Sequence, residues 1–229
     1  MVGERVVGLR LMPGIVTCDT ESDKEVCGRT VVIATGAQKR RLGIPAEHEL
    51  TGRGVVYCST CDGPLFRRLS IAIVGGSNSG LEAALEMEGI ADNVHLVSRS
   101  GLSGDQVLQD KVAASPTIVL EGYEPVKILG NDSVTGLVLR EQATGAETTL
   151  DVEGVFVEIG LRAHSDFVLD LVETNERGEI VVDGHGRTGI PGLFAAGDVI
   201  DMHDKQVIMA APQGARAALA CFEYIIQRT

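Results

Sequence analysis

Cys58 and Cys61 are separated by two residues in this 229-residue chain. At that spacing the two sulfur atoms can meet across one turn of helix or loop, so the pair can form an easily reduced disulfide in which one thiol gains a lowered pKa. The same spacing is also half of a zinc site, but zinc needs four ligands, and the sequence offers no second cysteine pair and no histidine pair. The spacing therefore favours a redox-active pair over a zinc half-site and over a buried pair without chemistry.

Asp62 follows Cys61 directly. A carboxylic acid beside a dithiol can relay a proton to a leaving thiolate, which would make Asp62 a general acid. The same side chain could instead cap the turn that follows it, which is a purely structural role. The sequence alone leaves both interpretations open.

A second candidate site is a glycine-rich turn at residues 75–80, between a predicted strand at 70–74 and a predicted helix at 81–90. A strand at 93–98 follows, and strand, turn, helix and strand within about 30 residues form a βαβ unit. Such turns place the free amides of a helix N-terminus under a pyrophosphate. The middle position of the G-x-G-x-x-G pattern is Ser77 here. The expected nucleotide-binding residues are Gly75, Gly76, Ser77, Asn78, Ser79 and Gly80.

The residue that ends the second strand of this unit bears on the choice between NADH and NADPH. NAD-binding units carry an acid about 20 residues after the turn, where it holds the ribose, and this chain has Arg99 there instead. A cation at that point suits a 2′-phosphate, so the sequence favours NADPH over NADH. A solvent-facing arginine without a ligand is the alternative interpretation.

Composition narrows the class of protein. The formal net charge is −12, and an acidic surface repels phosphate, so we expect no nucleic-acid partner. No run of 18 apolar residues occurs, so we expect no membrane span, and residues 1–10 lack the apolar core of a signal peptide. The five cysteines are an odd number and do not form a disulfide scaffold, which makes a cytoplasmic location the simplest expectation.

The remaining segments predict an α/β protein. Strands are expected at 6–11, 15–18, 30–35, 154–159, 179–182 and 192–196, and helices at 105–114 and 206–227. Residues 117–157 alternate apolar and polar side chains, which predicts antiparallel strands covering one side. Residues 37–54 are a polar crossover with Gly and Pro, of the kind that links domains.

With these pieces in order, the chain resembles the low-molecular-weight thioredoxin reductases, and more closely the flavoprotein subunit of alkyl hydroperoxide reductase. The matching blocks cover nearly the whole chain and are together far more specific than any one alone. They are Thr-Val-Val-Ile-Ala-Thr-Gly-Ala at 30–37, Val-Tyr-Cys-Ser-Thr-Cys-Asp-Gly-Pro-Leu-Phe at 56–66, Gly-Gly-Ser-Asn-Ser-Gly-Leu-Glu-Ala-Ala at 75–84, Asp-Gln-Val-Leu-Gln-Asp at 105–110, Gly-Leu-Phe-Ala-Ala-Gly-Asp at 192–198 and Lys-Gln-Val at 205–207.

The resemblance implies an NAD(P)H-dependent flavin disulfide reductase. Hydride would pass from NADPH or NADH to FAD, and the reduced flavin would reduce the disulfide of Cys58 and Cys61. Cys61 would lie nearer the flavin, Cys58 would attack the disulfide of a thioredoxin-like or peroxiredoxin-like protein, and Asp62 would be the general acid. The implied FAD-binding residues are Thr35, Gly36, Gly197, Asp198, Lys205, Gln206 and Val207.

The resemblance also implies the fold of a flavoprotein with two dinucleotide-binding domains. A Rossmann-like NAD(P)-binding domain at residues 41–164 would carry the cysteine pair, and an FAD-binding domain would consist of residues 1–40 and 165–229. The first domain would move relative to the second, and the expected assembly is a homodimer.

One departure from the family concerns FAD. Its members begin with an FAD-binding βαβ unit that has its own G-x-G-x-x-G, and residues 1–40 contain none. We therefore expect a truncated FAD-binding domain that lacks the phosphate-binding half of its site. The alternative function is a truncated nucleotide-binding module with no independent flavin activity.

Overall fold

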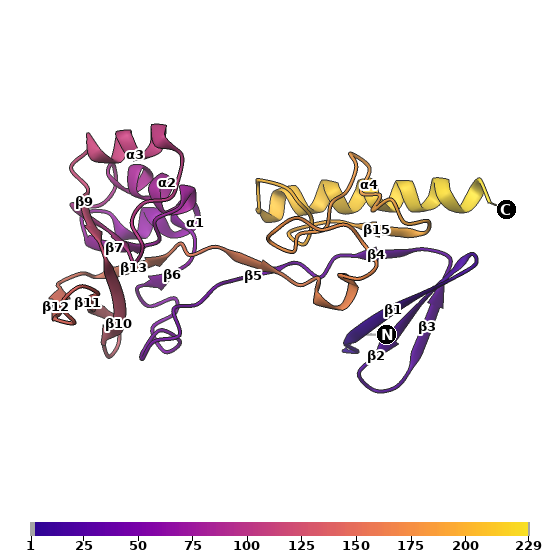
Figure 1. Ribbon diagram of the computed structural model, residues 1–229, viewed down its shortest axis with the longest axis horizontal. Helices are drawn as coiled ribbons and strands as arrows, with labels where there is room; N and C mark the ends of the chain where they lie inside the picture. The colour runs from indigo at the N-terminus through magenta and orange to yellow at the C-terminus, as the bar shows by residue number, and fades with distance from the viewer. Residues whose placement is uncertain (1–2, 229) are drawn as a thin grey trace. The chain divides into compact units, whose positions relative to one another are not determined.

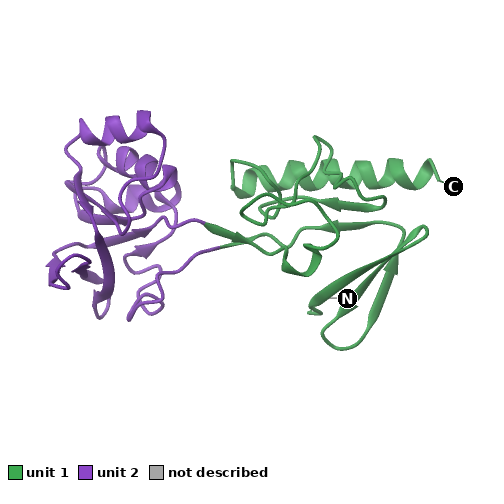
Figure 2. Cartoon of the chain, in the orientation of Figure 1, with its two compact units in different colours: residues 1–38, 161–229 green, residues 39–160 purple. Residues whose placement is uncertain are grey.

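The computed structural model describes residues 3–228 and shows a mixed α/β chain with two compact units (Figure 1, Figure 2). Unit 1 consists of residues 1–38 and 161–229, and unit 2 of residues 39–160. In the sequence, unit 2 is therefore one continuous segment inserted between the two segments of unit 1. The unit boundaries lie at 38/39 and 160/161, whereas the domain boundaries expected from the sequence are at 40/41 and 164/165.

Unit 2 is built on a five-stranded parallel sheet with the strand order β6-β13-β7-β8-β9. Its strands are β6 (Val55–Val56), β13 (Gly154–Val157), β7 (Ser70–Val74), β8 (Asn93–Ser98) and β9 (Ile118–Glu121). Parallel sheets are covered on both faces, which explains why β7 and β13 are almost continuously apolar. The predicted βαβ unit is confirmed, and β7 and β8 have the predicted bounds.

The two faces of this sheet carry different layers. Ile71 and Ile73 pack in one core with helix α2 (Asn78–Met87), and α3 (Gln106–Ala113) lies beside α2. Ala72 and Val74 belong to a second core, which an antiparallel sheet covers. That sheet consists of β10 (Tyr123–Gly130), β11 (Val134–Glu141) and β12 (Glu147–Leu150). Successive side chains of β7 thus alternate between the two cores.

Some expectations for unit 2 are wrong in detail. β9 lies in the stretch expected to be antiparallel, yet it pairs parallel with β8. Helix α2 begins at Asn78 and ends at Met87 rather than spanning 81–90, so residues 78–80 are its first turn. Asn, Ser and Gly are weak helix formers, and the sequence pattern therefore placed them in the preceding loop.

Unit 1 contains three small sheets in its described part. Strands β1 (Val6–Met12), β2 (Ile15–Thr20) and β3 (Glu25–Gly28) form an antiparallel meander. Strand β4 (Val31–Ile33) pairs parallel with β15 (Leu193–Ala195), and β5 (Ala37–Lys39) pairs with β14 (Leu161–Ala163). Helix α4 (Val207–Ile226) packs on β15 and β4, and the short helix η2 (Asp166–Val168) contacts β1. The expected strands at 6–11, 15–18, 30–35 and 192–196 and the last helix are confirmed within a few residues.

The strand expected at 179–182 does not form. Of these four described residues, Ile180 makes isolated bridges to Thr174 and Ile200, and the others make none. Ile180 is fully buried and Val182 packs against the same core, so the apolar residues of this segment reflect burial and not pairing in a sheet. Strands β3 and β5 were not expected, because four and three residues carry too little periodicity.

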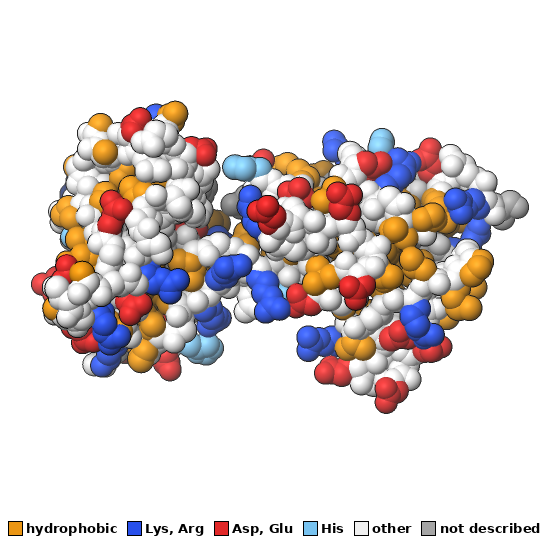
Figure 3. Space-filling view, in the orientation of Figure 1, with side chains coloured by type: hydrophobic (Ala, Val, Ile, Leu, Met, Phe, Trp, Pro, Cys, Tyr) orange, Lys and Arg blue, Asp and Glu red, His pale blue; other side chains and the backbone are white. Residues whose placement is uncertain are grey.

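Large apolar side chains remain exposed on unit 1. On α4 they include Leu219, Phe222 and Ile226, which are 70%, 65% and 58% exposed, and Val207 and Ile208 are exposed at its start. Figure 3 shows apolar side chains of unit 1 on the surface among acidic and basic ones. The apolar side of an amphipathic helix is normally buried against the protein core. The apolar side of α4 is therefore only partly covered by the described residues.

Candidate active site

Cys58 and Cys61 form a disulfide with a Cα–Cα distance of 5.3 Å. The bond spans the single-turn helix α1 (Ser59–Asp62), which starts soon after β6 ends at the carboxyl edge of the parallel sheet. The Cys58 sulfur accepts a hydrogen bond from the Cys61 amide at 3.1 Å. Cys61 is exposed and Cys58 half-buried, so the bond is accessible on the surface of unit 2.

Helix α1 is held against the core of unit 2 by the segment that follows it. The short helix η1 (Gly63–Phe66) packs Phe66 edge-to-face on Phe156, with ring centroids 4.8 Å apart. Gly63 lies so close to α2 that an added Cβ would come within 2.8 Å of the Met87 sulfur. A larger residue at position 63 would therefore push α1 and its disulfide away from α2.

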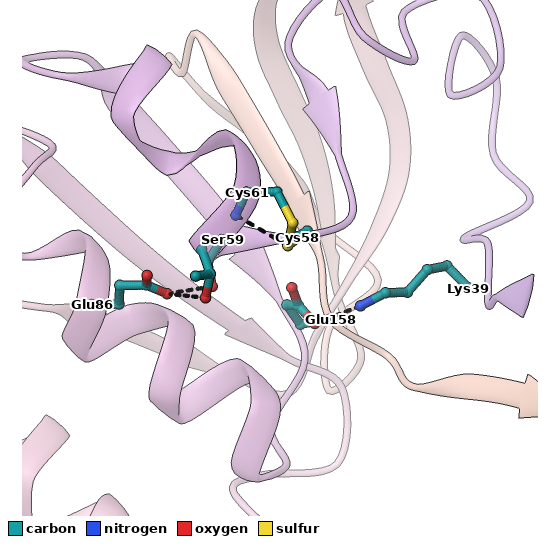
Figure 4. The surroundings of a disulfide bond; sticks show 7 residues. Lys39, Cys58, Ser59, Cys61, Glu86 and Glu158 are labelled. Carbon is teal, nitrogen blue, oxygen red and sulfur yellow. Dashed lines mark hydrogen bonds and ion pairs between the residues drawn. A yellow bond between two sulfur atoms is a disulfide. The ribbon is translucent and has the colours of Figure 1, made fainter. Parts of the chain in front are cut away.

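Carboxylates anchor the residues on both sides of Cys58. Before it, Tyr57 donates its hydroxyl to the buried Glu47 at 2.9 Å. After it, Ser59 donates its hydroxyl to Glu86 of α2 at 2.6 Å (Figure 4). Cys58 therefore sits in a chain segment whose direction is fixed on either side.

Glu158 is a buried carboxylate, with 6% of its surface exposed, directly after β13. Burial raises the pKa of Glu158, while Lys39, whose ammonium lies 3.7 Å away, and the Ser59 amide act to lower it. A carboxyl whose pKa is higher in the folded protein binds its proton more tightly there than when unfolded. Its contribution to stability is therefore present below the ordinary pKa of 4.5 and lost as the pH rises through the folded value.

The raised pKa of Glu158 leads to a prediction about the stability of the Glu158→Gln variant. At pH 7 the melting temperature of unit 2 is expected to be a few degrees higher in the variant, because the amide carries no buried charge. Such a shift corresponds to a gain of about 1 kcal/mol in the free energy of unfolding. Well below pH 4.5, where Glu158 is neutral in both states, the two proteins should melt alike. Lys39 is 40% exposed and stays hydrated without its partner. Calorimetric melting at both pH values measures this, and a lower melting temperature at pH 7 would contradict it.

Asp62 is half-buried at the end of α1. It occupies the N-cap position of η1, but its side chain makes no capping hydrogen bond in the described structure. Its backbone amide donates to the Cys58 carbonyl at 3.1 Å. The capping role therefore has no support in the described structure.

The glycine-rich turn has no space for side chains at three positions. An added Cβ would lie 2.1 Å from the Glu158 carbonyl oxygen at Gly75, 2.3 Å from the Ser98 hydroxyl at Gly76 and 2.0 Å from the Gly75 carbonyl oxygen at Gly80. Gly75 also has a positive φ of 149°. The turn thus packs backbone directly on β13, β8 and α2, as a pyrophosphate-binding turn requires.

The polar side chains of this turn have protein partners as well. Asn78 accepts from the Asp105 amide at 2.7 Å and donates to the Asp105 carboxylate at 3.1 Å, which ties α2 to the start of α3. Ser77 is the N-cap residue of α2, and Ser79 donates to the Glu158 carbonyl at 3.4 Å. Asn78 therefore has a structural role that its sequence position did not reveal.

A cavity of about 570 Å³ opens at the carboxyl edge of the sheet beside this turn. Gly75, Gly76 and Ser77 line it together with the predicted Arg99. The polar crossover contributes two further cations, Arg40 and Arg41. Neither arginine was expected to line a site, although adjacent basic residues in a linker were a visible signal in the sequence. Amides, glycines and three guanidinium groups suit the phosphates of a dinucleotide, so NAD(P) fits this site.

The residues expected to bind FAD lie in unit 1. Thr35 and Gly36 follow β4, and Gly197 and Asp198 follow the neighbouring strand β15. Lys205, Gln206 and Val207 lie at the N-terminus of α4, of which Gln206 is the N-cap. The structure therefore brings these three groups to the carboxyl ends of two adjacent strands.

Several of these side chains already have partners. The Lys205 side chain is only 11% exposed; it donates to the Asp198 and Ile200 carbonyls, and it pairs with the buried Glu179 at 3.1 Å. Thr35 donates to the His164 carbonyl at 2.6 Å. The described part of unit 1 contains no strand, glycine turn and helix that could hold a pyrophosphate. The residues present therefore fit FAD only in part.

Metal ligands do not gather in the described chain. Residues 3–228 contain no group of three or more His, Cys, Asp or Glu side chains that could hold a metal ion. The additional ligands that a zinc site at Cys58 and Cys61 needs are therefore not brought together there. No helix of the described residues is long and apolar enough to cross a membrane.

The model of the pyridine nucleotide-disulphide oxidoreductase family matches residues 1–218. The chain belongs to this family. The F subunit of alkyl hydroperoxide reductase in Staphylococcus aureus strain Mu50 is 41% identical to it over 229 residues, and the match covers 99% of this chain and 45% of that protein. The Staphylococcus epidermidis protein of the same name is 38% identical over the same coverage. The chain thus spans less than half the length of these curated relatives.

Solved structures of thioredoxin reductases share its fold. The Streptococcus pyogenes enzyme has a TM-score of 0.90 and 34% identity, and the match covers 98% of this chain and 74% of that one. The Giardia duodenalis enzyme has a TM-score of 0.91 and 26% identity, with 97% and 74% covered. The fold expected from the resemblance, that of a flavoprotein with two dinucleotide-binding domains, is confirmed, and so is membership of the thioredoxin reductase-like group.

Proposed function

We propose that this chain supplies the nucleotide-binding and dithiol parts of an NAD(P)H-dependent flavin disulfide reductase. One observation carries the proposal: the disulfide of Cys58 and Cys61 and the glycine turn at 75–80 follow β6 and β7, and so lie at one edge of one parallel sheet. Dinucleotides bind at this edge of such sheets. Unit 2 would therefore hold NADPH or NADH and the redox-active pair, and unit 1 would hold part of an FAD site.

FAD, when bound, would take two electrons from the nicotinamide and deliver them to the disulfide. The chain's own step begins with the dithiol. The disulfide takes up two electrons and two protons and becomes two thiols. The Cys58 thiolate then attacks a partner's disulfide, which forms a mixed disulfide and releases one partner thiolate. Cys61 attacks the Cys58 sulfur, which restores the disulfide of this chain and frees the second partner thiolate.

Two features of the site support roles in this exchange. The Cys61 amide, which donates to the Cys58 sulfur at 3.1 Å, would stabilise a thiolate on Cys58. Asp62, next to Cys61 and without a capping bond, would take the proton of each attacking cysteine and pass it to the leaving partner thiolate. The relatives named as thioredoxin reductases and as alkyl hydroperoxide reductase subunits support a thioredoxin- or peroxiredoxin-type protein as the partner.

The arginine at the end of β8 gives a prediction about the nucleotide. Arg99→Ala is expected to raise the Kd for NADPH about tenfold and to change the Kd for NADH less than about twofold, because only NADPH carries the 2′-phosphate. Calorimetric titration of both nucleotides measures this. Arg67→Ala, an exposed residue outside the cavity, is the matched control. Equal weakening of both nucleotides would show that Arg99 does not read the 2′-phosphate.

An absorption spectrum and a nucleotide titration test the function as a whole. The proposal predicts one NADPH or NADH site per chain and a flavin spectrum after incubation with FAD. The incomplete FAD site of unit 1 favours a second candidate, a nucleotide-binding module without independent flavin activity. That candidate predicts the nucleotide site without a flavin spectrum, and a chain that binds neither nucleotide would exclude both.

A further inference from the structure

Glu47 is a buried carboxylate in the polar crossover at residues 37–54. It is 3% exposed, and its two oxygens accept three hydrogen bonds. Oε1 accepts from the Leu42 amide and from the Tyr57 hydroxyl, both at 2.9 Å, and Oε2 accepts from the Gly43 amide at 2.8 Å. A buried carboxylate is stable only with such partners, so Glu47 binds the crossover and the segment before the disulfide to one acceptor.

The turn that carries Glu47 is itself fixed. The Glu47 carbonyl accepts from the Thr51 hydroxyl at 2.8 Å. Ala46, directly before it, has a φ of 68°, in the left-handed region that costs free energy for a residue with a Cβ. The Ile128 amide of β10 donates to the Pro45 carbonyl at 3.2 Å. A strained backbone persists only where its neighbours hold it, so the side chain of Glu47 starts from a fixed position.

Tyr57 connects this carboxylate with the disulfide. Strand β6 ends at Val56, so Tyr57 is the first residue beyond the sheet and the last before Cys58. Its ring packs against the core that the antiparallel sheet covers. Burial, together with the hydrogen bond to Glu47, raises the pKa of Tyr57. The hydroxyl therefore keeps its proton at neutral pH and can donate it to the hydrogen bond.

The contacts on the other side of Cys58 are of a different kind. The Cys61 amide donates to the Cys58 sulfur and the Asp62 amide to the Cys58 carbonyl, both at 3.1 Å. Both donors belong to α1, so these bonds move with the helix. Ser59 reaches Glu86 through an exposed hydroxyl, and water can replace that contact at little cost. The nearest polar anchor that is shielded from water is therefore on the residue before Cys58.

We propose that Glu47 is a positioning residue for the dithiol and acts through the Tyr57 hydroxyl. The contact holds Cys58 where its sulfur can close on Cys61. This inference rests on the redox role of the pair under the proposed function. In the oxidised chain the disulfide itself restrains Cys58. In the reduced chain that bond is open, and the fixed side chain of Tyr57 limits the positions of the Cys58 thiol, so less conformational freedom is lost on closure.

The closure equilibrium with glutathione tests the proposal on the whole chain, without nucleotide or flavin. Closure releases two electrons and two protons, which oxidised glutathione takes up to become two thiols. Tyr57→Phe removes the hydroxyl and keeps the ring, so it should lower the closure constant about threefold. Tyr123→Phe is the matched control and should close like the wild type. Tyr123 packs against the same core, and its hydroxyl has no hydrogen bond among the described residues.

Glu47→Gln distinguishes positioning from stability. Glutamine has one carbonyl oxygen, so in either orientation of its side chain one of the two crossover amides loses its acceptor. Tyr57 keeps a partner, because its hydroxyl can donate to the carbonyl oxygen or accept from the NH2 group. Glu47→Gln should therefore melt below the wild type and yet close with the wild-type constant. If it lowered the closure constant as much as Tyr57→Phe, the contact would act on stability alone and the proposal would fail.

A measurement on the wild type decides the question if Tyr57→Phe does not fold. In the reduced chain the Tyr57 hydroxyl proton should exchange slowly with water and be visible by NMR, because it is bound to a buried carboxylate. A rapidly exchanging hydroxyl, or an unchanged closure constant in folded Tyr57→Phe, would overturn the proposal. Since neither measurement needs nucleotide or flavin, such a result is distinct from failure of NAD(P)H binding.

Discussion

Replacing either Cys58 or Cys61 by serine is expected to lower two-electron exchange with a partner disulfide by several orders of magnitude. A single thiol can start a thiol–disulfide exchange but cannot complete it, because the mixed disulfide has no second sulfur to resolve it. The fold of unit 2 should persist, since the bond closes a loop of only three peptide units and Cys61 is exposed. The measurement is the rate at which the dithiothreitol-reduced chain reduces an oxidised thioredoxin.

The two variants should differ in what they trap. If Cys58 is the attacking thiol, Cys61→Ser accumulates a covalent mixed disulfide with the partner, and Cys58→Ser accumulates none. Mass spectrometry of the unreduced mixture distinguishes the two. Cys27→Ser is the control, because Cys27 is an exposed free cysteine in unit 1. Undiminished electron transfer by both variants would show that the pair is not the redox centre.

Gly80→Ala is expected to destabilise unit 2 strongly. Its Cβ would lie 2.0 Å from the Gly75 carbonyl oxygen and 2.7 Å from the Gly75 carbonyl carbon, and neither backbone atom can move without displacing the turn. Overpacking of this kind costs about 1–3 kcal/mol or more, which lowers the melting temperature by about 5–10 °C in a protein of this size. The displaced turn should also weaken NADPH binding at least about tenfold.

Gly89→Ala is the matched control for this substitution. Gly89 follows α2 and has a negative φ, and an added Cβ there would meet no atom within 4 Å, so alanine should be neutral at this position. Melting by circular dichroism and NADPH titration by calorimetry measure both variants. If Gly80→Ala melted and bound NADPH like Gly89→Ala, the close packing of the turn on α2 would not be what shapes the nucleotide site.

The sequence predicts the parts of this molecule that depend on local pattern. Strands β7 and β8 are apolar runs bounded by turn residues, and the glycine turn between them has a recognisable chemistry, so their bounds agree with the structure. The parallel pairing of β9 could not be foreseen, because its four residues are too few to distinguish it from the antiparallel strands that follow. Pairing partners are set by the tertiary structure and not by periodicity.

In the candidate site, too, features set by local sequence could be predicted and features set by tertiary structure could not. Cys58 and Cys61 stand out because their spacing permits a bond, and the structure forms that bond. Glu158 was expected to lie within a strand, and nothing in its neighbours along the chain indicates that its carboxylate is buried and paired with Lys39. Lys205 was expected to face a flavin, but its contacts with Asp198 and Glu179 arise from segments that meet only after folding.

Thiol counting after anaerobic addition of NADPH tests the central claim most directly. The oxidised chain is incubated with FAD, NADPH is added, and free cysteines are alkylated and assigned by mass spectrometry. The account predicts that Cys58 and Cys61 become alkylated only when NADPH is present, while Cys18, Cys27 and Cys221 do not change. If Cys58 and Cys61 stayed bonded with NADPH and FAD but opened with dithiothreitol, the claim of NAD(P)H-dependent disulfide reduction by this chain would be contradicted.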